Sequence, residues 1–162
     1  MSKFNHLDKA IIECLNQDAR ASSAEIARGL GIAERTVRYR IQRLIDQKAI
    51  HPITVINPAA FGYNLAVDIF CEVDLEYQNQ TLDALLHLPE VTYVAISTGD
   101  QDIILQAIFK NSDEVHEFVT QKLHHVPGMR RTRTVLVPRI LKDTYQWLPP
   151  EEAYELEEAK SE

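Results

Sequence analysis

The sequence predicts an α+β protein with two domains: an N-terminal helix-turn-helix (winged-helix-like) domain and a ferredoxin-like βαββαβ domain. Apolar residues recur at helical spacing up to about residue 50 and then alternate, as in strands. Residues 1–60 carry nine Lys and Arg against six Asp and Glu, a net charge of +3, in a chain whose total is −7. The expected boundaries are 1–50 for the helix-turn-helix domain, 51–62 for a linker strand, 63–145 for the ferredoxin-like domain and 146–162 for an acidic tail.

Three amphipathic helices are expected in the first domain. Asn5 can cap the first, and Ser22 with Glu25 has the spacing of a capping box, in which each side chain accepts a hydrogen bond from the other residue's backbone N–H. Gly31 ends the second helix, and a Gly-Ile-Ala turn leads into the third. The first helix spans about 6–17 with apolar residues Leu7, Ile11, Ile12 and Leu15, and the third runs to about Gln47 with Val37, Ile41, Leu44 and Ile45.

The rest of the sequence predicts four strands and two helices in the order β-α-β-β-α-β. Pro52 and Pro58 mark residues 51–57 as a short strand or an extended linker. We expect Gly99 to take the positive φ of a tight hairpin between the two middle strands. The expected strands are 64–74, 91–98, 101–109 and 131–141, and the expected helices are 80–87 and 112–126.

Apolar residues are expected on both faces of this sheet. They are Val67, Ile69, Val73, Val94, Ile96, Ile103, Ile104 and Leu105. The two helices cover one face, and the other face needs a second cover if it is apolar. A second copy of the chain supplies that cover most simply, so we expect at least a homodimer.

The third helix carries four arginines and gives the sharpest functional signal. When its apolar stripe is turned inward at ~100° per residue, several polar side chains point outward. Arg bonds guanine bidentately, Gln and Thr reach base edges, and flanking arginines contact phosphates. A solvated basic face is the simpler alternative, but the capped helix and short turn before it favour binding of double-stranded DNA. The candidates are Arg35, Thr36, Tyr39, Gln42 and Arg43 facing outward, with Arg38 and Arg40 on the flanks.

The loop between the two middle strands is the second candidate site. An amino acid needs a carboxylate for its ammonium group and backbone N–H groups or hydroxyls for its own carboxylate, and a glycine turn beside two aspartates offers both. The residues alone leave open a tight turn with solvated aspartates. The candidates are Thr98, Gly99, Asp100, Gln101 and Asp102, with Thr132 and Thr134 on the last strand as weaker ones.

Other kinds of site are not indicated by the sequence. The six histidines do not cluster at metal-ligand spacing, the two cysteines fit a reducing cytosol, and no nucleotide-binding loop or nucleophile motif occurs. Apolar stretches are too short for a membrane span or a signal peptide. We therefore expect a cytoplasmic protein that is not an enzyme and that takes no cofactor, metal or membrane as a partner.

A series of short motifs extends over nearly the whole chain. They are Leu7–Ile12, Asp18–Arg20, Glu25–Ala27, Gly31–Ile32, Val37–Leu44, Ile50, Thr98–Ile103 and Pro127–Met129. In this order they resemble the Lrp/AsnC (feast/famine) transcription regulators. The resemblance implies an effector-binding and oligomerisation domain over 63–145, dimers that often form octamers, binding of operator DNA, and a response to an amino acid or related metabolite. It also favours an effector site over a simple turn at residues 98–102.

Three positions depart from that family's pattern. Ala33 stands where Ser or Thr usually caps the third helix, and Lys48 stands where Gly often ends it. Both departures should cost local stability, of order 1 kcal/mol for the cap. Gln101 stands where an aromatic residue is frequent, which leaves the identity of the effector open.

Two alternatives are compatible with parts of the sequence. The chain also resembles the sirohaem decarboxylases, which use the same two-domain architecture for tetrapyrrole chemistry with histidine near the substrate. Such an enzyme has no need for outward-facing Arg35, Tyr39 and Arg43, so the third helix discriminates the two functions. A stand-alone metabolite-binding or assembly module would have no helix-turn-helix at all.

Overall fold

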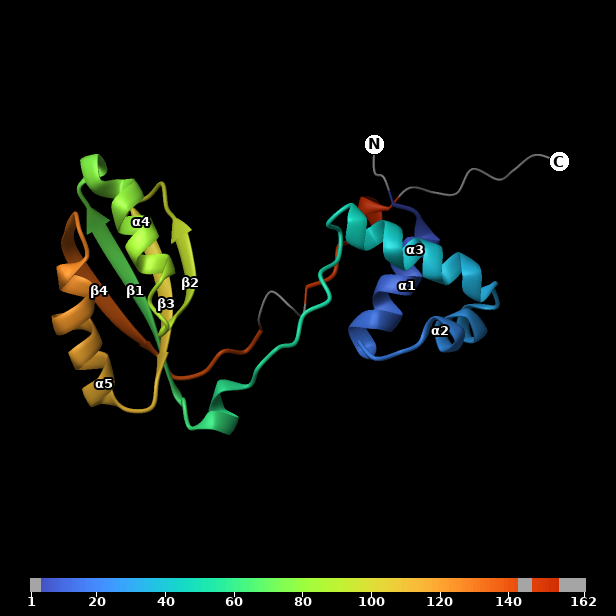
Figure 1. Ribbon diagram of the computed structural model, residues 1–162, viewed down its shortest axis with the longest axis horizontal. Coiled ribbons are helices and arrows are strands. Elements are labelled where there is room, and N and C mark those ends of the chain that lie inside the picture. The colour runs from blue at the N-terminus through green and yellow to red at the C-terminus, as the bar shows by residue number, and fades with distance from the viewer. Residues whose placement is uncertain (1–3, 143–146, 155–162) are drawn as a thin grey trace. The chain divides into compact units, whose positions relative to one another are not determined.

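The computed structural model describes residues 4–142 and 147–154, which fall into two compact units (Figure 1). Residues 1–55 group with residues 142–162 in the first, here the helical unit. Residues 56–141 form the second, here the sheet unit. Within the described ranges, no helix is long and apolar enough to cross a bilayer.

Two helices of the helical unit begin at capping boxes. Asn5 accepts a hydrogen bond from the backbone N–H of Asp8 at the start of α1 (His6–Gln17), and Ser22 accepts one from Glu25 at the start of α2 (Ser23–Leu30). In each box the carboxylate accepts the N–H of the capping residue in return. α2 ends at Gly31, whose φ of 68° is left-handed. The expected limits of both helices are confirmed.

α3 (Glu34–Asp46) lacks a side-chain cap at its start and a glycine at its end. Ala33 precedes it and makes no side-chain hydrogen bond to the first turn. After the helix, Lys48 has a φ of 57°, the one positive φ outside glycine among the described residues. A side chain in this left-handed conformation crowds its own backbone, which glycine avoids. The two departures at Ala33 and Lys48 are therefore visible in the structure, as a helix start without a side-chain cap and as a left-handed residue after the helix.

The three helices share one apolar core. α3 turns the predicted stripe inward, and its opposite side is consequently left at the surface. The buried residues are Ile11, Ile26, Ala27, Val37 and Leu44, with Ile41 among the partly buried residues packed around them.

The segment after α3 is extended and pairs with no strand. Residues 51–57 form no ladder, and the side chains of Ile53 and Ile56 are exposed. A 3-10 turn, η1 (Pro58–Phe61), follows and ends at Gly62. Of the two possibilities that the sequence left open here, the structure shows the extended linker.

The sheet unit has the predicted βαββαβ order. Its elements are β1 (Leu65–Val73), α4 (Gln78–Leu86), β2 (Val91–Ile96), β3 (Ile103–Phe109), α5 (Ser112–Glu117) and β4 (Met129–Val137). The strands form one antiparallel sheet in the order β2-β3-β1-β4, and Figure 1 shows α4 and α5 on the same side of it. The expected helix over 112–126 is regular only in its first part, because a π turn (Phe118–Lys122) and a 3-10 turn (Leu123–His125) follow α5.

The two faces of the sheet differ more than the sequence predicts. Alternate residues of β1 and β3 are buried under the helices. Of the apolar strand residues expected on both faces, the register places only Ile104 on the open face. The other residues named in the sequence analysis lie on the helix-covered face, because residues two apart in a strand share one side, and the open face has further apolar residues of its own. The open face combines Ala66, Phe70, Tyr93, Ala95, Ile104, Ile108, Val135 and Val137 with Asp68, Glu72, Gln106, Arg131 and Arg133.

The β2–β3 connection is longer than a tight hairpin. Its six residues run from Ser97 to Asp102. The expectation that Gly99 takes a positive φ is wrong. The left-handed conformation occurs instead at Gly128, in the Pro-Gly turn before β4. A Cβ there would lie 2.6 Å from the Cβ of Tyr77 and 3.0 Å from Oγ1 of Thr81, so only glycine fits.

The described end of the chain belongs to the helical unit. Residues Glu151–Ala153 form a 3-10 turn, η6, and the side chain of Tyr154 is buried. The sequence predicted an acidic tail here. Residues 155–162 of that tail lie outside the described residues.

Candidate nucleic-acid interface and effector loop

The outer side of α3 presents four of the seven candidate DNA-binding residues. Arg38 pairs with Glu34 one turn earlier, and Nε2 of Gln42 donates to Oδ1 of Asp46 at 2.8 Å. Both acceptors are exposed, so little stability is lost when these side chains exchange them for another partner. The four exposed candidates are Arg35, Arg38, Tyr39 and Gln42.

A buried carboxylate holds the other two arginines of this helix. Asp8 on α1 is fully buried, and its Oδ1 accepts a hydrogen bond from Arg40 at 3.0 Å. Its Oδ2 lies 3.7 Å from a guanidinium nitrogen of Arg43. Arg40 also donates to Oδ1 of Asn5 at 2.9 Å. Arg40 and Arg43 are therefore half-buried beside Asp8 rather than fully outward-facing, because a buried carboxylate requires a cationic partner, and their binding to DNA stays a prediction.

Asp8 is the residue of this region that sequence reasoning missed. It lies four residues before Ile12 and seven before Leu15, on the apolar stripe of α1. A carboxylate in such a position is seldom buried unless it is paired. The stripe therefore contains the signal for a buried cation nearby, although it does not say which arginine supplies it.

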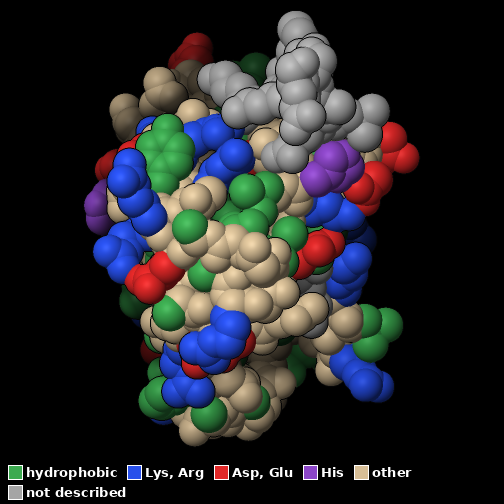
Figure 2. Space-filling view, turned by 90° about the vertical axis from the view of Figure 1, so that its right-hand side faces the viewer, with side chains coloured by type: hydrophobic (Ala, Val, Ile, Leu, Met, Phe, Trp, Pro, Cys, Tyr) green, Lys and Arg blue, Asp and Glu red, His purple; other side chains and the backbone are tan. Residues whose placement is uncertain are grey.

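The exposed face of α3 carries Arg35 and Arg38 beside the carboxylates Glu34 and Asp46, and it is rich in hydrogen-bond donors. Seen from the side of the helical unit, Figure 2 shows Lys and Arg side chains spread over the surface. A hollow of about 210 Å³ lies beside the last turns of α3 and is lined by Tyr39, Gln42, Arg43, Asp46 and Gln47. Thr36 is half-buried rather than fully outward-facing. Guanidinium, phenol and amide groups on one helix face can bind both phosphates and base edges.

The two aspartates of the β2–β3 loop have different surroundings. Oδ2 of Asp102 accepts the backbone N–H of Val73 at 2.8 Å, and the N–H of Asp102 donates to the carbonyl of Cys71 at 3.0 Å. Asp102 therefore joins the loop to the end of β1. Asp100 is exposed, as are Thr98 and Gly99, whereas Gln101 is half-buried. Of the two carboxylates, Asp100 is the one open to a ligand.

The two candidate threonines lie away from this loop within one chain. Thr132 and Thr134 are on β4, which pairs with β1, and β1 separates them from β3. Two strand spacings amount to roughly 10 Å. Oγ1 of Thr132 lies 3.2 Å from Nε2 of His124. A single chain thus does not bring the threonines and the loop together.

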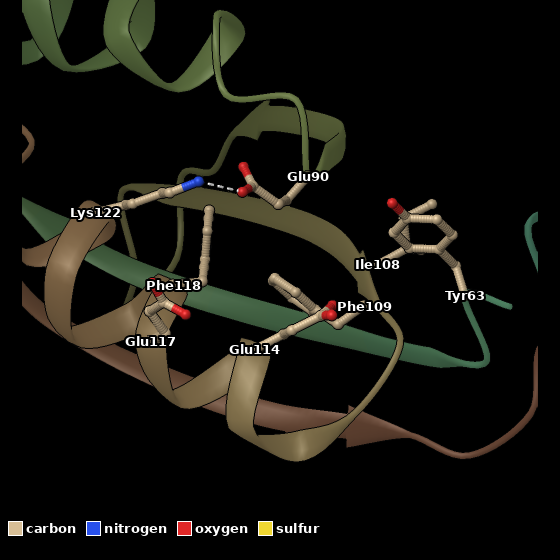
Figure 3. A pocket seen from close by; sticks show the side chains of 8 residues that line it. All are labelled: Tyr63, Glu90, Ile108, Phe109, Glu114, Glu117, Phe118 and Lys122. Carbon is tan, nitrogen blue, oxygen red and sulfur yellow. Dashed lines mark hydrogen bonds and ion pairs between the residues drawn. The ribbon is translucent and has the colours of Figure 1, made fainter.

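A pocket of about 220 Å³ lies between α5 and the sheet, where the sequence predicted no site (Figure 3). Its lining combines aromatic rings, three glutamates and one lysine, namely Tyr63, Glu90, Ile108, Phe109, Glu114, Glu117, Phe118 and Lys122. Lys122 donates to Oε1 of Glu90, and this contact raises the pKa of Lys122. Lys122 therefore pairs with one of the three glutamates that line the pocket.

The described residues offer no group of three or more His, Cys, Asp or Glu arranged to hold a metal ion. Cys71, on β1, is fully buried, and burial raises the pKa of its thiol to about 12. The thiol is therefore protonated at neutral pH and acts as a small core residue.

Comparison with known families covers both units. The AsnC-type helix-turn-helix domain matches residues 5–45, and the Lrp/AsnC ligand binding domain matches residues 67–147. The HTH-type transcriptional regulator FL11 of Pyrococcus furiosus is 34% identical over 142 residues, which cover 87% of this chain and 93% of FL11.

Solved structures share the fold at lower sequence identity. Escherichia coli AsnC superposes with a TM-score of 0.81 at 23% identity, covering 88% of this chain and 98% of AsnC. A Neisseria meningitidis transcriptional regulator, solved as a complex with L-methionine, gives a TM-score of 0.85 at 20% identity and covers 93% of this chain and 99% of its own.

Proposed function

Because the chain belongs to the Lrp/AsnC family of transcription regulators, we propose that it binds a specific operator sequence through α3 and responds to an amino acid bound at a subunit interface. The observation that carries the DNA-binding part is the exposed set Arg35, Arg38, Tyr39 and Gln42 on the outer side of α3. Arg35, Tyr39 and Gln42 read base edges, and Arg38 contacts a phosphate.

The DNA-binding assignment is tested on duplexes selected by the protein from a random pool. Arg35→Ala and Tyr39→Ala should each weaken operator binding by about 1–3 kcal/mol and relax the sequence preference, because a base contact is lost. Arg38→Ala should weaken binding to all duplexes alike. Arg139→Ala, which removes an exposed arginine from the sheet unit, is the matched control and should change little.

Salt dependence supplies a second measurement of the same interface. Operator affinity should fall steeply with salt, and Arg38→Ala should reduce the slope by about one unit. If all three substitutions on α3 weaken every duplex equally, the assignment of Arg35 and Tyr39 to base edges is wrong.

The effector part of the proposal places an amino acid against the β2–β3 loop. Asp100 would hold its ammonium group, because Asp102 is already bound to the backbone of β1. The methionine complex of the Neisseria regulator supports an amino acid as the class of ligand. Since Thr132 and Thr134 are remote from the loop in one chain, they would reach the ligand only from a second subunit. Coupling of this kind is typically worth about 1–3 kcal/mol.

Titration calorimetry with the twenty amino acids tests the effector site. Asp100→Asn should abolish binding and leave DNA binding without effector unchanged. Asp102→Asn should instead destabilise the sheet unit by about 1–3 kcal/mol, because the N–H of Val73 loses a charged acceptor. If no amino acid binds, or if binding is indifferent to Asp100→Asn, the loop is a structural turn.

For assembly we propose a two-fold dimer through the open face of the sheet, and an octamer of four such dimers. Phe70, Ile104 and Ile108 lie on that face beside charged residues. Ile104→Asp should lower the mass measured by light scattering, whereas Leu86→Asp, on the exposed side of α4, should not. A wild-type mass of 18.5 kDa at micromolar concentration would exclude the dimer.

The sirohaem-decarboxylase alternative gains no support from the comparisons, in which the named relatives are transcription regulators. A stand-alone metabolite-binding module does not account for the helix-turn-helix at residues 5–45. A protein that binds operator DNA works where the chromosome lies, so we place this one in the cytoplasm.

A further inference from the structure

The described C-terminal residues, 147–154, make charged contacts with α1, and we call them the C-terminal strap. Oε2 of Glu151 accepts a hydrogen bond from Nζ of Lys9, and its Oε1 lies 3.2 Å from Nδ1 of His6. Lys9 holds the pKa of Glu151 below its ordinary value, and Glu151 raises the pKa of Lys9. Figure 1 shows the η6 turn beside the start of α1. The strap is thus attached to the first helix of the DNA-binding unit.

The last described residue adds an apolar anchor to these charged contacts. Tyr154 is 8% exposed, although it lies close to the C-terminus of the sequence. Burial raises the pKa of its hydroxyl, and the carboxylate of Glu13 on α1 raises it further. Because a buried tyrosine removes roughly 150–250 Å² from water, this contact stabilises the docked strap more than surface ion pairs do.

A continuous set of contacts leads from the strap to α3. Lys9, which binds Glu151, adjoins Asp8 on α1. Asp8 is fully buried and binds Arg40 and Arg43 of α3. A shift of α1 would therefore move the carboxylate that holds both arginines.

We infer that the C-terminal strap positions the recognition helix α3, because it holds α1 and thereby fixes Asp8 beneath Arg40 and Arg43. Glu151 and Tyr154 act as positioning residues, since neither lies on the exposed side of α3. The strap follows β4 in sequence and belongs to the helical unit. The effect of the strap on DNA binding rests on the proposed function, whereas its effect on the structure of α1 and on Arg40 does not.

The test uses the full chain and two variants that release the strap. Glu151→Gln removes the charge that binds Lys9, and Tyr154→Ala removes the anchor. Glu152→Gln alters the exposed neighbour in the same turn, and Tyr154→Phe keeps the ring, so these are the matched controls. Amide hydrogen exchange of α1 and the NMR signal of Arg40 Nε–H are measured without DNA, and the ratio of operator to random-duplex affinity is measured with it.

Both releasing variants should accelerate exchange in α1 and shift or broaden the Arg40 signal. The operator-to-random ratio should fall by about 3- to 30-fold, the size expected for residues that act through others. Both controls should behave like the wild type. Faster exchange in α1 with an unchanged Arg40 signal would overturn the positioning role, because the strap would then only stabilise the helix.

Unchanged exchange and an unchanged Arg40 signal in both releasing variants would overturn the inference entirely. If the wild-type chain shows no preference for any duplex, the proposed function fails. The exchange and Arg40 measurements still decide the inference in that case, since they need no DNA.

Discussion

α2 and α3 are neighbouring helices of one unit, yet they are stabilised in opposite ways. α2 begins at a capping box made by Ser22 and Glu25 and ends at Gly31, so its own sequence satisfies both ends. α3 begins after Ala33, which provides no cap, and is followed by Lys48 in a left-handed conformation. Local signals therefore define α2, whereas α3 depends on its packing.

The packing of α3 has an apolar and a charged component. Val37 and Leu44 are fully buried in the core of the helical unit. Arg40 and Arg43 contact the buried carboxylate of Asp8 on α1. The helix proposed to read DNA is thus held from behind by tertiary contacts, whereas Arg38 and Gln42 on its exposed side pair with residues of the same helix.

Removing the charge of Asp8 is expected to have the largest effect on the stability of α3. Asp8→Asn should lower the free energy of opening of α3 by about 3 kcal/mol, because Arg40 and Arg43 lose a buried counter-charge. The same substitution removes the carboxylate that accepts the backbone N–H of Asn5 in the capping box of α1. Native-state hydrogen exchange of α3 amides measures this energy. Asp46→Asn removes an exposed carboxylate from α3 itself, and an equal loss there would contradict the special role of Asp8.

Removing the cap of α2 should have a smaller effect, confined to that helix. Ser22→Ala should destabilise α2 by about 1 kcal/mol, with Ser23→Ala as the control. Hydrogen bonds from Ser22 lower the pKa of Glu25, so the capping contribution is present above the ordinary carboxylate pKa and is lost as pH falls through the lowered one. An NMR titration should show this pKa returning toward its ordinary value in the variant, and an unchanged pKa would contradict the capping box.

Glycine in place of Lys48 should stabilise the end of α3. Lys48→Gly should stabilise α3 by about 1 kcal/mol, because glycine adopts a φ of 57° without crowding. Gln47→Gly, at a φ of −84°, is the control and should give no gain. Equal effects at the two positions would show that the conformation of Lys48 is not the cause.

A new cap at the start of α3 should give the smallest gain in stability. Ala33→Ser should stabilise α3 by about 0.5–1 kcal/mol, because the backbone of Ala33 already has cap geometry and a hydroxyl would accept an N–H of the first turn. Ala24→Ser, inside α2, should be neutral or destabilising. A loss of stability on Ala33→Ser would mean that the hydroxyl cannot reach the first turn.

The sequence by itself determined the elements and their order. Capping boxes, helical stripes and strand alternation act over a few residues, so α1, α2 and the βαββαβ succession follow from local patterns. The same local logic placed Arg35, Tyr39 and Gln42 on the outer side of α3 and Arg38 on its flank, and all four are exposed. It predicted the connection between β2 and β3 but misjudged its shape, because Gly99 has no need of a positive φ in a six-residue connection.

Only the tertiary structure decided which charged groups serve the fold and which are left for a ligand. Asp8 lies 32 residues from Arg40, and Asp102 lies 29 residues from Val73, so no local pattern specifies these pairs. Glu151 meets Lys9 across 142 residues. A charge is committed to the fold when packing removes it from water and brings a partner within reach, and this depends on chain segments that only folding brings together.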